Sequence, residues 1–385
     1  MKAVIIKENR RAEVADIAEQ SMRPNYIKIK CVAVAINPVD LHICHSGGGE
    51  GGILGKKQAT SRLTKLRWSP GCDVAGIVEE VGKDCQSQVS KGDHVYGVCH
   101  GANINGPEDG GFAEFAMLKD GLLGKIPEGL SFEDAATFGL GVTTVGQALY
   151  MILGFPLPTE PKQTSKTILI HGGSGATGTL AIQYAKMSGL RVITTASSKN
   201  FDLVKSRGAD EVFDYHDPDC ASKIKSCCDD KLHLVLNCVG TKASHKVVAD
   251  AFPEKSDEEM KLVTVLRPDD WPRKDVNAQS FQVFTTFGER YWKWENEYPA
   301  LPQHYEFGVK FWKIHSDLLF AGKIKPHPVE LGKGGFHGIL KGMYDVATCT
   351  ISGAKLVFNI SDEAANVVAD AESRVALKDP TTIKR

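Results

Sequence analysis

The feature that most constrains the fold of this chain is a short apolar run that stops in a cluster of glycines. Residues 166–171 (KTILIH) form the kind of continuous apolar run found in strands buried on both faces. The glycine cluster 172–178 (GGSGATG) follows, and apolar residues then recur at helical spacing over 180–185. Ser188-Gly189 ends that helix before a second strand over 191–196. The pattern predicts a βαβ unit and hence a parallel sheet.

Three of these glycines have the spacing Gly173-x-Gly175-x-x-Gly178. Between a strand and a helix this spacing is typical of dinucleotide sites, because glycines let the backbone approach a pyrophosphate and the helix start offers free N–H groups. A glycine turn chosen for packing alone is the alternative. No Gly-Lys-Ser/Thr follows, which excludes a P-loop.

The end of the second strand decides which dinucleotide binds. An NAD site places an acid there, about 20 residues beyond the loop. This chain has Ser197, Ser198, Lys199 and Asn200 instead. Two hydroxyls and an ammonium can satisfy a 2′-phosphate with charge-assisted hydrogen bonds, so we predict NADPH. An ordinary helix N-cap by Ser198 or Asn200 would explain the same residues.

The rest of the chain suggests two domain types. Short strand-like runs separated by turns precede residue 131, where Ser131 begins a helical pattern. Further strand candidates at 211–215, 232–239 and 262–266 extend the parallel sheet. We therefore predict an α/β protein with a β-rich domain over 1–145 and a doubly wound nucleotide-binding domain over 146–322. A return to the first domain over 323–360 and a disordered polar tail over 361–385 complete the prediction.

Composition narrows the function classes. The 46 Lys and Arg residues balance 47 Asp and Glu residues, so no global field would hold a nucleic acid. The longest apolar stretches are strand-sized, and we expect no membrane span. The N-terminus reaches a charge too early for a signal peptide, so we expect a cytoplasmic protein. Ten scattered cysteines without a C-x-x-C pair indicate reduced thiols.

Four segments resemble landmarks of the medium-chain dehydrogenase/reductase superfamily, in its order: 35–40 (AINPVD), 70–82 (PGCDVAGIVEEVG), 92–97 (GDHVYG) and 139–144 (GLGVTT). The resemblance implies a GroES-like β-rich catalytic domain and a Rossmann domain. Zinc-dependent members have Cys, His and Cys at the positions of Asn37, Cys72 and Leu140. Asn is a poor zinc ligand and Leu is none, and the four-cysteine structural lobe is absent as well. We expect no metal.

Within the zinc-free branch, the chain most resembles the fungal trans-acting enoyl reductases over about residues 24–360. More specific marks are 37–40, 197–209, 212–215, 286–289 and 351–357. The resemblance implies a monomeric enzyme of secondary metabolism. Its substrate would be an α,β-unsaturated thioester of a polyketide intermediate, held on the carrier of a partner polyketide synthase or hybrid synthase.

Site residues follow from the same resemblance. It implies NADPH contacts from Val39, Asp40, Leu41, His42, Thr144, Ser174, Gly175, Ala176, Thr177, Ser197, Ser198, Lys199, Asn200, Tyr215, Leu266, Ile351 and Ser352. It implies an acyl pocket lined by Val145, Val283, Phe284, Thr285, Thr286 and Phe287. Ordinary core or turn packing is the alternative for each of these residues.

The chemistry leaves several points open. Without zinc, hydrogen-bond donors near Thr144, a ribose hydroxyl or backbone N–H groups would have to stabilise an enolate. No catalytic residue or proton donor is identified, although His42 and His45 flank the expected site. The basic segment 46–69 is either a solvated loop or a surface for an acidic carrier protein. A reductase of free quinones or enones, and a non-catalytic NADPH-binding protein, remain alternatives.

Overall fold

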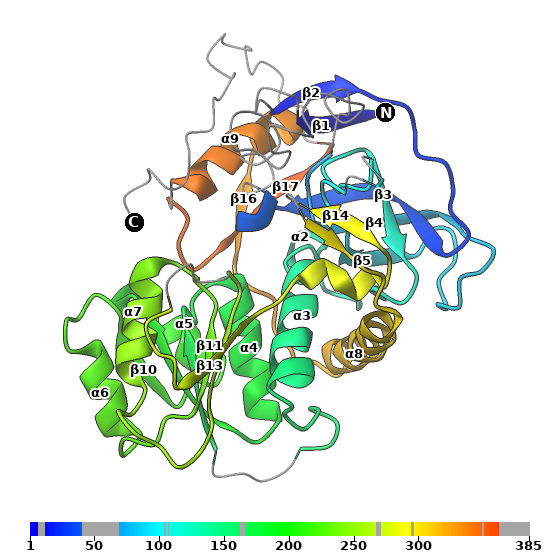
Figure 1. The fold of residues 1–385 in the computed structure, drawn as a ribbon. Coiled ribbons are helices and arrows are strands. Elements are labelled where there is room, and N and C mark those ends of the chain that lie inside the picture. Colours follow the sequence, from blue (N-terminus) through cyan, green and yellow to red (C-terminus); the bar gives the residue numbers. More distant parts are fainter. Residues whose placement is uncertain are drawn as a thin grey trace. The chain divides into compact units, whose positions relative to one another are not determined.

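The computed structural model describes residues 1–6, 12–40, 69–103, 105–106, 108–161, 166–266, 271–293, 296–348 and 350–361. The chain divides into two compact units (Figure 1). Unit 1 comprises Met1–Leu140, Phe284–Ser316 and Pro328–Arg385, and unit 2 comprises Gly141–Val283 and Asp317–His327.

Unit 1 is built on a seven-stranded sheet. Its order is β16 (Val329–Gly332), β17 (Lys355–Asn359), β3 (Tyr26–Ala35), β4 (Asp73–Val81), β5 (His94–Val98) and β7 (Leu123–Lys125), and β6 (Phe115–Lys119) pairs with β3 beside this path. A separate hairpin joins β1 (Lys2–Ile6) to β2 (Ala12–Asp16). The strand-like runs of the sequence near 27–36, 74–78, 92–97 and 111–116 lie at or beside these strands. β17 pairs antiparallel with β3, so residues 357–359 lie beside residues 33–35 in this sheet.

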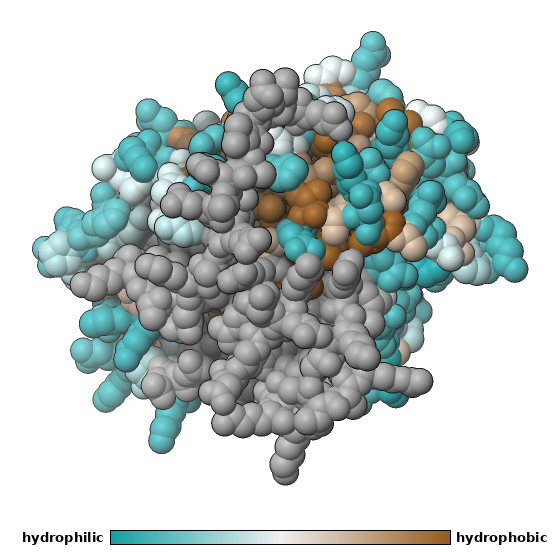
Figure 2. Space-filling model, turned by 90° about the horizontal axis from the view of Figure 1, so that it is seen from above, coloured by the Kyte–Doolittle hydropathy of each residue, from teal (hydrophilic) through white to brown (hydrophobic). Residues whose placement is uncertain are grey.

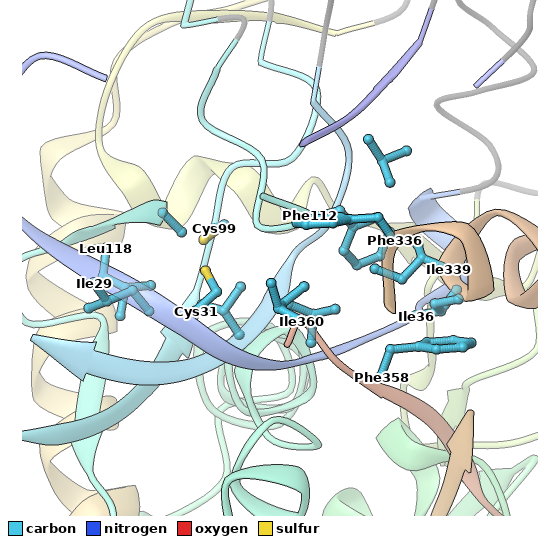
Figure 3. Packing of buried hydrophobic residues seen from close by; sticks show 14 of the residues in the cluster. Ile29, Cys31, Ile36, Cys99, Phe112, Leu118, Phe336, Ile339, Phe358 and Ile360 are labelled. Atoms are coloured by element: carbon cyan, nitrogen blue, oxygen red, sulfur yellow. The ribbon is translucent and has the colours of Figure 1, made fainter. Parts of the chain in front are cut away.

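The core of unit 1 lies between this sheet and α9 (Gly335–Ala347). Figure 3 shows Phe336 and Ile339 of α9 close to Phe358 of β17 and Ile36, with Cys31 and Cys99 of the same cluster on the side toward Ile29 and Leu118. The short helix α2 (Phe132–Ala135) begins at Ser131, whose hydroxyl accepts the N–H of Asp134 at 3.0 Å. The predicted start of a helix at Ser131 is therefore confirmed.

Residues 284–316 group with unit 1, whereas the predicted boundaries placed them in the nucleotide-binding domain. This stretch holds most of η4 (Val283–Phe287), the hairpin β14 (Tyr291–Lys293) and β15 (Asn296–Tyr298), and most of α8 (Pro302–Phe320). The physical reason is a set of polar ties. The Lys119 ammonium donates to the Phe287 carbonyl at 2.6 Å, and the Tyr26 hydroxyl donates to Glu289 at 3.0 Å. These ties link segments far apart in the chain, so local sequence patterns carry no sign of them.

Unit 2 contains a six-stranded sheet in the order β10 (Glu211–Asp214), β9 (Arg191–Ala196), β8 (Thr167–His171), β11 (Leu234–Asn237), β12 (Met260–Thr264) and β13 (Val276–Ser280). Every pairing in it is parallel. In chain order this is 3-2-1-4-5-6, the arrangement of a Rossmann domain. The predicted α/β class is confirmed. β13 has no counterpart among the predicted strands, because its polar sequence VNAQS lacks an apolar run.

In unit 2, at least one helix lies between each pair of consecutive strands from β8 to β12. The helices of unit 2 include η2 (Gly146–Ile152), α4 (Ala176–Met187), η3 (Ser198–Asn200), α5 (Phe201–Ser206), α6 (Cys220–Cys227) and α7 (Lys242–Ala251), while α3 (Gly139–Val145) begins in unit 1 and ends in unit 2. Buried side chains of the central strands pack with α6 and α7 in one hydrophobic cluster. That cluster packs these helices against the sheet, and ligands bind outside the carboxyl ends of the strands in sheets of this kind.

One helical stretch departs from the expectation that all apolar runs are strand-sized. Residues Phe132–Ile152 are long and apolar enough to cross a membrane by length and composition, yet 89% of the apolar window is buried inside the protein, as in a core helix.

The described surface on the face in Figure 2 is mostly hydrophilic, with hydrophobic residues gathered nearer its centre. The eight cysteines in the described ranges are all free thiols.

Candidate functional site

The three spaced glycines of the loop in unit 2 differ in how closely other atoms surround them. A Cβ on Gly173 would lie 1.9 Å from the Thr194 hydroxyl, and one on Gly178 would lie 2.3 Å from the Gly172 carbonyl, so neither position admits a side chain. A Cβ on Gly175 would meet only the Gly172 carbonyl, at 3.7 Å. The loop is therefore tightly packed at its two ends and open at its middle glycine.

The middle glycine is also the N-cap of α4, with extended backbone and no capping side chain. The first N–H groups of a helix have no intrahelical acceptor, and here Ala176 and Thr177 supply them. Open space in front of exposed N–H groups at the positive end of a helix dipole suits a diphosphate. The loop thus fits the pyrophosphate of a dinucleotide.

The end of β9 presents the residues predicted to choose the dinucleotide. Ser198 and Lys199 are exposed, whereas Asn200 is buried and donates from its side-chain amide to the Ser197 hydroxyl at 3.2 Å. An acid from the next strand lies beside them, because Asp214 accepts the Ser198 N–H at 3.2 Å. Its other oxygen accepts hydrogen bonds from the backbone N–H and from the ring of His216. Both oxygens of the Asp214 carboxylate therefore already have donors from nearby residues. The sequence prediction did not consider this acid.

Other predicted cofactor residues of unit 2 lie after neighbouring strands. Tyr215 follows β10, is 42% exposed, and faces the ring of His171 edge-on with 6.5 Å between centroids. Leu266 follows β12 and lies against the glycine after β11, since a Cβ on Gly240 would lie 2.7 Å from it. The carboxyl ends of β8, β9, β10 and β12 thus gather the predicted residues 174–177, 197–200, Tyr215 and Leu266 at one edge of the sheet. Thr144 lies on α3 and is buried.

Six predicted cofactor residues belong to unit 1, and the structure describes four of them. Val39 and Ile351 both pack against its core cluster, and Ser352 follows Ile351 directly. Asp40 is fully buried, and its carboxylate accepts the backbone N–H groups of Asn37 at 2.8 Å and Gly71 at 3.1 Å. Leu41, His42 and His45, and all but the last residue of the segment 46–69, lie outside the described residues. The roles assigned to all these residues stay predictions.

At the positions matching zinc ligands, unit 1 has a hydrogen-bonded ion pair. The Lys355 ammonium, on β17, pairs with the buried carboxylate of Asp73 and donates to the Asn37 side-chain oxygen at 2.9 Å. The Asn37 amide donates to the same carboxylate at 2.9 Å, and the Leu140 backbone N–H donates to its other oxygen. Asn37 and Leu140 therefore donate hydrogen bonds to the Asp73 carboxylate, from a side-chain amide and from a backbone N–H group.

Cys72, at the third matching position, is fully buried beside Asp40. Burial raises the pKa of its thiol well above the ordinary value, and the neighbouring Asp40 carboxylate adds to the rise. Burial likewise raises the pKa of Asp40 to about 6, opposed by the hydrogen bond from the Asn37 N–H. A protonated thiol is a poor metal ligand. Within the described ranges, no group of three or more His, Cys, Asp and Glu side chains could hold a metal ion, and independence from zinc stays a prediction.

The predicted acyl-pocket residues fall in both units. Val283 ends its stretch of unit 2 and accepts a hydrogen bond from the Gln147 side chain at 3.3 Å, and Val145 of α3 is buried. Phe284, Thr285, Thr286 and Phe287 belong to unit 1 and are buried. The ring of His100 stacks on Phe284 at 4.6 Å and on Phe287 at 4.9 Å between centroids. An imidazole therefore holds the two phenylalanines of this segment in place.

Four residues of unit 1 were missed as site candidates by the sequence analysis. Asp73 and Lys355 stand inside the quoted motifs 70–82 and 351–357, so those motifs held a signal. His100 and Lys293 lie outside every motif. Lys293 is 1% exposed, and its ammonium lies 3.4 Å from the centre of the Phe284 ring. Nothing in the spacing of these residues predicts that they meet.

Comparison with known proteins agrees with this geometry. Residues 23–128 match the family described as the alcohol dehydrogenase GroES-like domain, and residues 176–252 match the one described as zinc-binding dehydrogenase. An alcohol dehydrogenase superfamily protein from Novosphingobium aromaticivorans has a similar fold, with a TM-score of 0.72 and 21% identity over 93% of this chain and 99% of that one.

Closer relatives are known from sequence. The trans-enoyl reductase ACTTS2 of Alternaria alternata is 38% identical over 360 residues, which cover 93% of this chain and 98% of the relative. The trans-enoyl reductase TOXD of Cochliobolus carbonum is 40% identical over 290 residues, 75% of this chain and 91% of the relative. The predicted resemblance is confirmed: the chain belongs to the medium-chain dehydrogenase/reductase superfamily, in the family of the fungal trans-enoyl reductases.

Proposed function

We propose that this chain is a trans-acting, NADPH-dependent enoyl reductase. Its substrate is the α,β-unsaturated thioester of a polyketide intermediate, presented on the carrier of a partner polyketide synthase or hybrid synthase. The observation that carries the proposal is similarity to trans-enoyl reductases along almost the whole length of both proteins. The glycine loop and the ion pair at the matching zinc positions agree with it.

The cofactor side of the proposal rests on unit 2. When bound, the reduced nicotinamide supplies a hydride. The open middle of the glycine loop and the N–H groups of Ala176 and Thr177 hold the pyrophosphate. The exposed Lys199 and Ser198 hold the 2′-phosphate, and Asp214 offers little opposition because His216 and the Ser198 N–H occupy its oxygens.

The substrate side rests on the residues that replace zinc ligands. Alcohol and ketone chemistry in this superfamily relies on a Lewis acid, and Asn37 and Leu140 cannot form an open three-ligand zinc site. Reduction of a carbon–carbon double bond conjugated to a thioester needs a hydride at the β-carbon and stabilisation of the charge that develops on the oxygen. The buried segment Phe284–Phe287 of unit 1 is the candidate for contact with the acyl chain.

The experiment that tests the function uses the intact partner system. A synthase that makes a polyketide with an unreduced double bond is run with NADPH, with and without this protein, and the products are compared by mass spectrometry. We expect a gain of two hydrogens only when the protein is present. The same products with and without it would contradict the proposal.

A second arm separates the proposal from a reductase of free small molecules. Purified protein and NADPH are offered a free quinone, a free enone, and an enoyl thioester on pantetheine or on a carrier protein. Oxidation of NADPH with the thioesters supports the proposal. Turnover of quinones alone would assign the chain to the other class, and tight NADPH binding without turnover of any substrate would indicate a binding protein.

We also propose that the enzyme acts as a monomer in the cytoplasm. The edge strand β13 supports the first point, because most of its side chains are exposed and polar, which does not favour pairing with a second sheet. Light scattering of the purified protein at micromolar concentration should give the mass of one chain. A fluorescent fusion expressed in a fungal host should distribute through the cytoplasm.

A further inference from the structure

Four lysines in the described part of unit 1 are buried, and one of them differs from the other three. Lys28 pairs with Glu19, Lys119 with Glu289 and Lys355 with Asp73. Lys293 forms no ion pair with any residue that the structure describes. A buried ammonium without a counter-ion is costly in free energy, so such residues are rarely kept for stability alone. An unpaired buried cation is therefore a candidate functional group.

Lys293 is held in place on several sides. It ends β14, and its ammonium donates a hydrogen bond to the Gly101 carbonyl at 2.9 Å. The ammonium also lies 3.4 Å from the centre of the Phe284 ring, a cation–π contact. Burial lowers the pKa of Lys293 to about 7, although Cys72 and Asp40 oppose the shift. The side chain is thus held in place, and an added anion beside it would favour its charged form.

Neighbouring polar atoms are also unsatisfied. The Nε2 atom of His100 and the hydroxyl of Tyr291 are buried and have no hydrogen-bond partner in the described part of the protein. Both rings pack against Phe284, and the His100 and Tyr291 ring centroids are 4.9 Å apart. Buried polar groups in folded proteins are almost always satisfied, by water if not by protein. The cluster around Phe284 therefore has hydrogen-bonding capacity for a further polar group.

The position of the cluster connects it to the replaced zinc site. Gly101, which accepts from Lys293, also lies against Cys72, since a Cβ on Gly101 would be 3.1 Å from the Cys72 sulfur. Cys72 matches a zinc ligand of the metal-dependent relatives. Lys293 therefore places a positive charge beside a position where those relatives bind a metal cation.

Resting on the proposed function, we propose that Lys293 is a catalytic residue whose ammonium binds the thioester oxygen of the substrate and stabilises its negative charge. When bound, the reduced nicotinamide would supply a hydride to the β-carbon, and the π electrons of the double bond would shift so that the oxygen becomes an enolate oxygen. Lys293 donates a hydrogen bond to that oxygen. A proton from water then bonds to the α-carbon and the carbonyl re-forms.

The test compares Lys293→Met with a matched control, Lys28→Met. Lys28 is also a buried lysine of unit 1 with its ammonium near an aromatic ring, 5.2 Å from the centre of Phe115, but it pairs with Glu19. With an enoyl pantetheine thioester, Lys293→Met should lower kcat about 100-fold or more while KM changes little, as for loss of one oxyanion donor. Lys28→Met should stay within about twofold of the wild type.

A second readout needs no cofactor and no turnover. Acetoacetyl pantetheine can bind as a ketone or as an enolate, and the enolate absorbs in the near ultraviolet. We expect the wild type and Lys28→Met to bind it as the enolate at neutral pH, Lys293→Arg to keep part of the signal, and Lys293→Met to lose it. A wild type that binds only the ketone overturns the proposal, even if Lys293→Met fails to fold.

The outcomes separate this proposal from the proposed function. If the wild type reduces enoyl thioesters and a folded Lys293→Met keeps its kcat, the role of Lys293 is wrong and the function stands. If the wild type reduces no enoyl thioester, the function is wrong. In that case, enolate binding that Lys293→Met abolishes would still support an oxyanion site.

Discussion

The two units present different kinds of positive group: backbone N–H groups at a helix start in unit 2, and buried lysine side chains in unit 1. In unit 2, the glycine loop offers backbone N–H groups and open space, and it carries no charged side chain. In unit 1, the positive groups are buried lysine side chains: Lys355, which pairs with Asp73, and Lys293, which has no ion-pair partner among the residues that the structure describes. A backbone site is defined by local spacing, whereas a side-chain site depends on which distant segments the fold brings together.

The sequence separations make this difference concrete. The glycine loop needs seven consecutive residues, 172–178. Lys355 and Asp73 are 282 positions apart, and Lys293 and Gly101 are 192 positions apart. Variants in the two regions should therefore fail differently: those of the loop through steric conflict or loss of cofactor, and those of the charged network through an uncompensated buried charge.

The largest effect on stability is expected from Lys355→Met. The change leaves the fully buried Asp73 carboxylate without its cation, which typically lowers the free energy of unfolding by about 3–5 kcal/mol. Urea unfolding followed by circular dichroism measures it. Lys28→Met should lose about 1 kcal/mol or less, because its partner Glu19 is 54% exposed. Equal losses in both variants would show that the buried pair contributes no more to the free energy of unfolding than the exposed one.

A pair of loop variants tests the steric account of the glycines. Gly178→Ala places a methyl group 2.3 Å from the Gly172 carbonyl, so the free energy of unfolding should fall by about 2–3 kcal/mol. Gly175→Ala has room in the protein itself and should keep its thermal midpoint, but its methyl group occupies the space in front of the helix start and should weaken NADPH binding. Thermal denaturation and cofactor titration measure the two effects. Normal NADPH affinity in Gly175→Ala would remove the pyrophosphate from this position.

The buried charge of Lys293 should appear as a pH dependence of stability. Its pKa of about 7 lies below the ordinary value of 10.5, so between these pH values the unfolded chain binds more protons than the folded one. Stability should therefore rise with pH, by about 2 kcal/mol between pH 7 and 9 relative to Lys293→Met. Cys72 and His100 interact electrostatically with Lys293, so the difference between the two curves reports Lys293 together with its effect on these neighbours. Parallel pH curves for the two proteins would mean that Lys293 titrates normally.

The smallest effect is expected at the dinucleotide-selecting position. Lys199→Ala should weaken NADPH binding about tenfold, the usual worth of a charge-assisted hydrogen bond at an exposed site, and leave NADH binding unchanged. Isothermal titration with each cofactor measures both. Wild-type preference for NADH, or equal losses for the two cofactors, would assign the phosphate contact elsewhere.

The sequence predicted much of unit 2 and part of unit 1. The strand, glycine turn and helix of residues 166–187 form a continuous local pattern, and the structure has them as β8 and α4. The polar edge strand β13 carries no such pattern. The assignment of residues 284–316 to unit 1 depends on long-range ties such as Lys119 to Phe287. Residue type alone predicted that Asn37 and Leu140 would not bind zinc. It could not predict that both donate hydrogen bonds to the Asp73 carboxylate.

The most direct test of the account follows the hydride itself. The enzyme is incubated with an enoyl pantetheine thioester and NADPH that carries deuterium on one or the other face of nicotinamide C4, in the presence of a metal chelator. The account predicts that one labelled cofactor, and not the other, delivers deuterium to the β-carbon, so that the saturated product gains one deuterium and one solvent hydrogen. A product without deuterium from either cofactor, or activity that the chelator abolishes and added zinc restores, would contradict it.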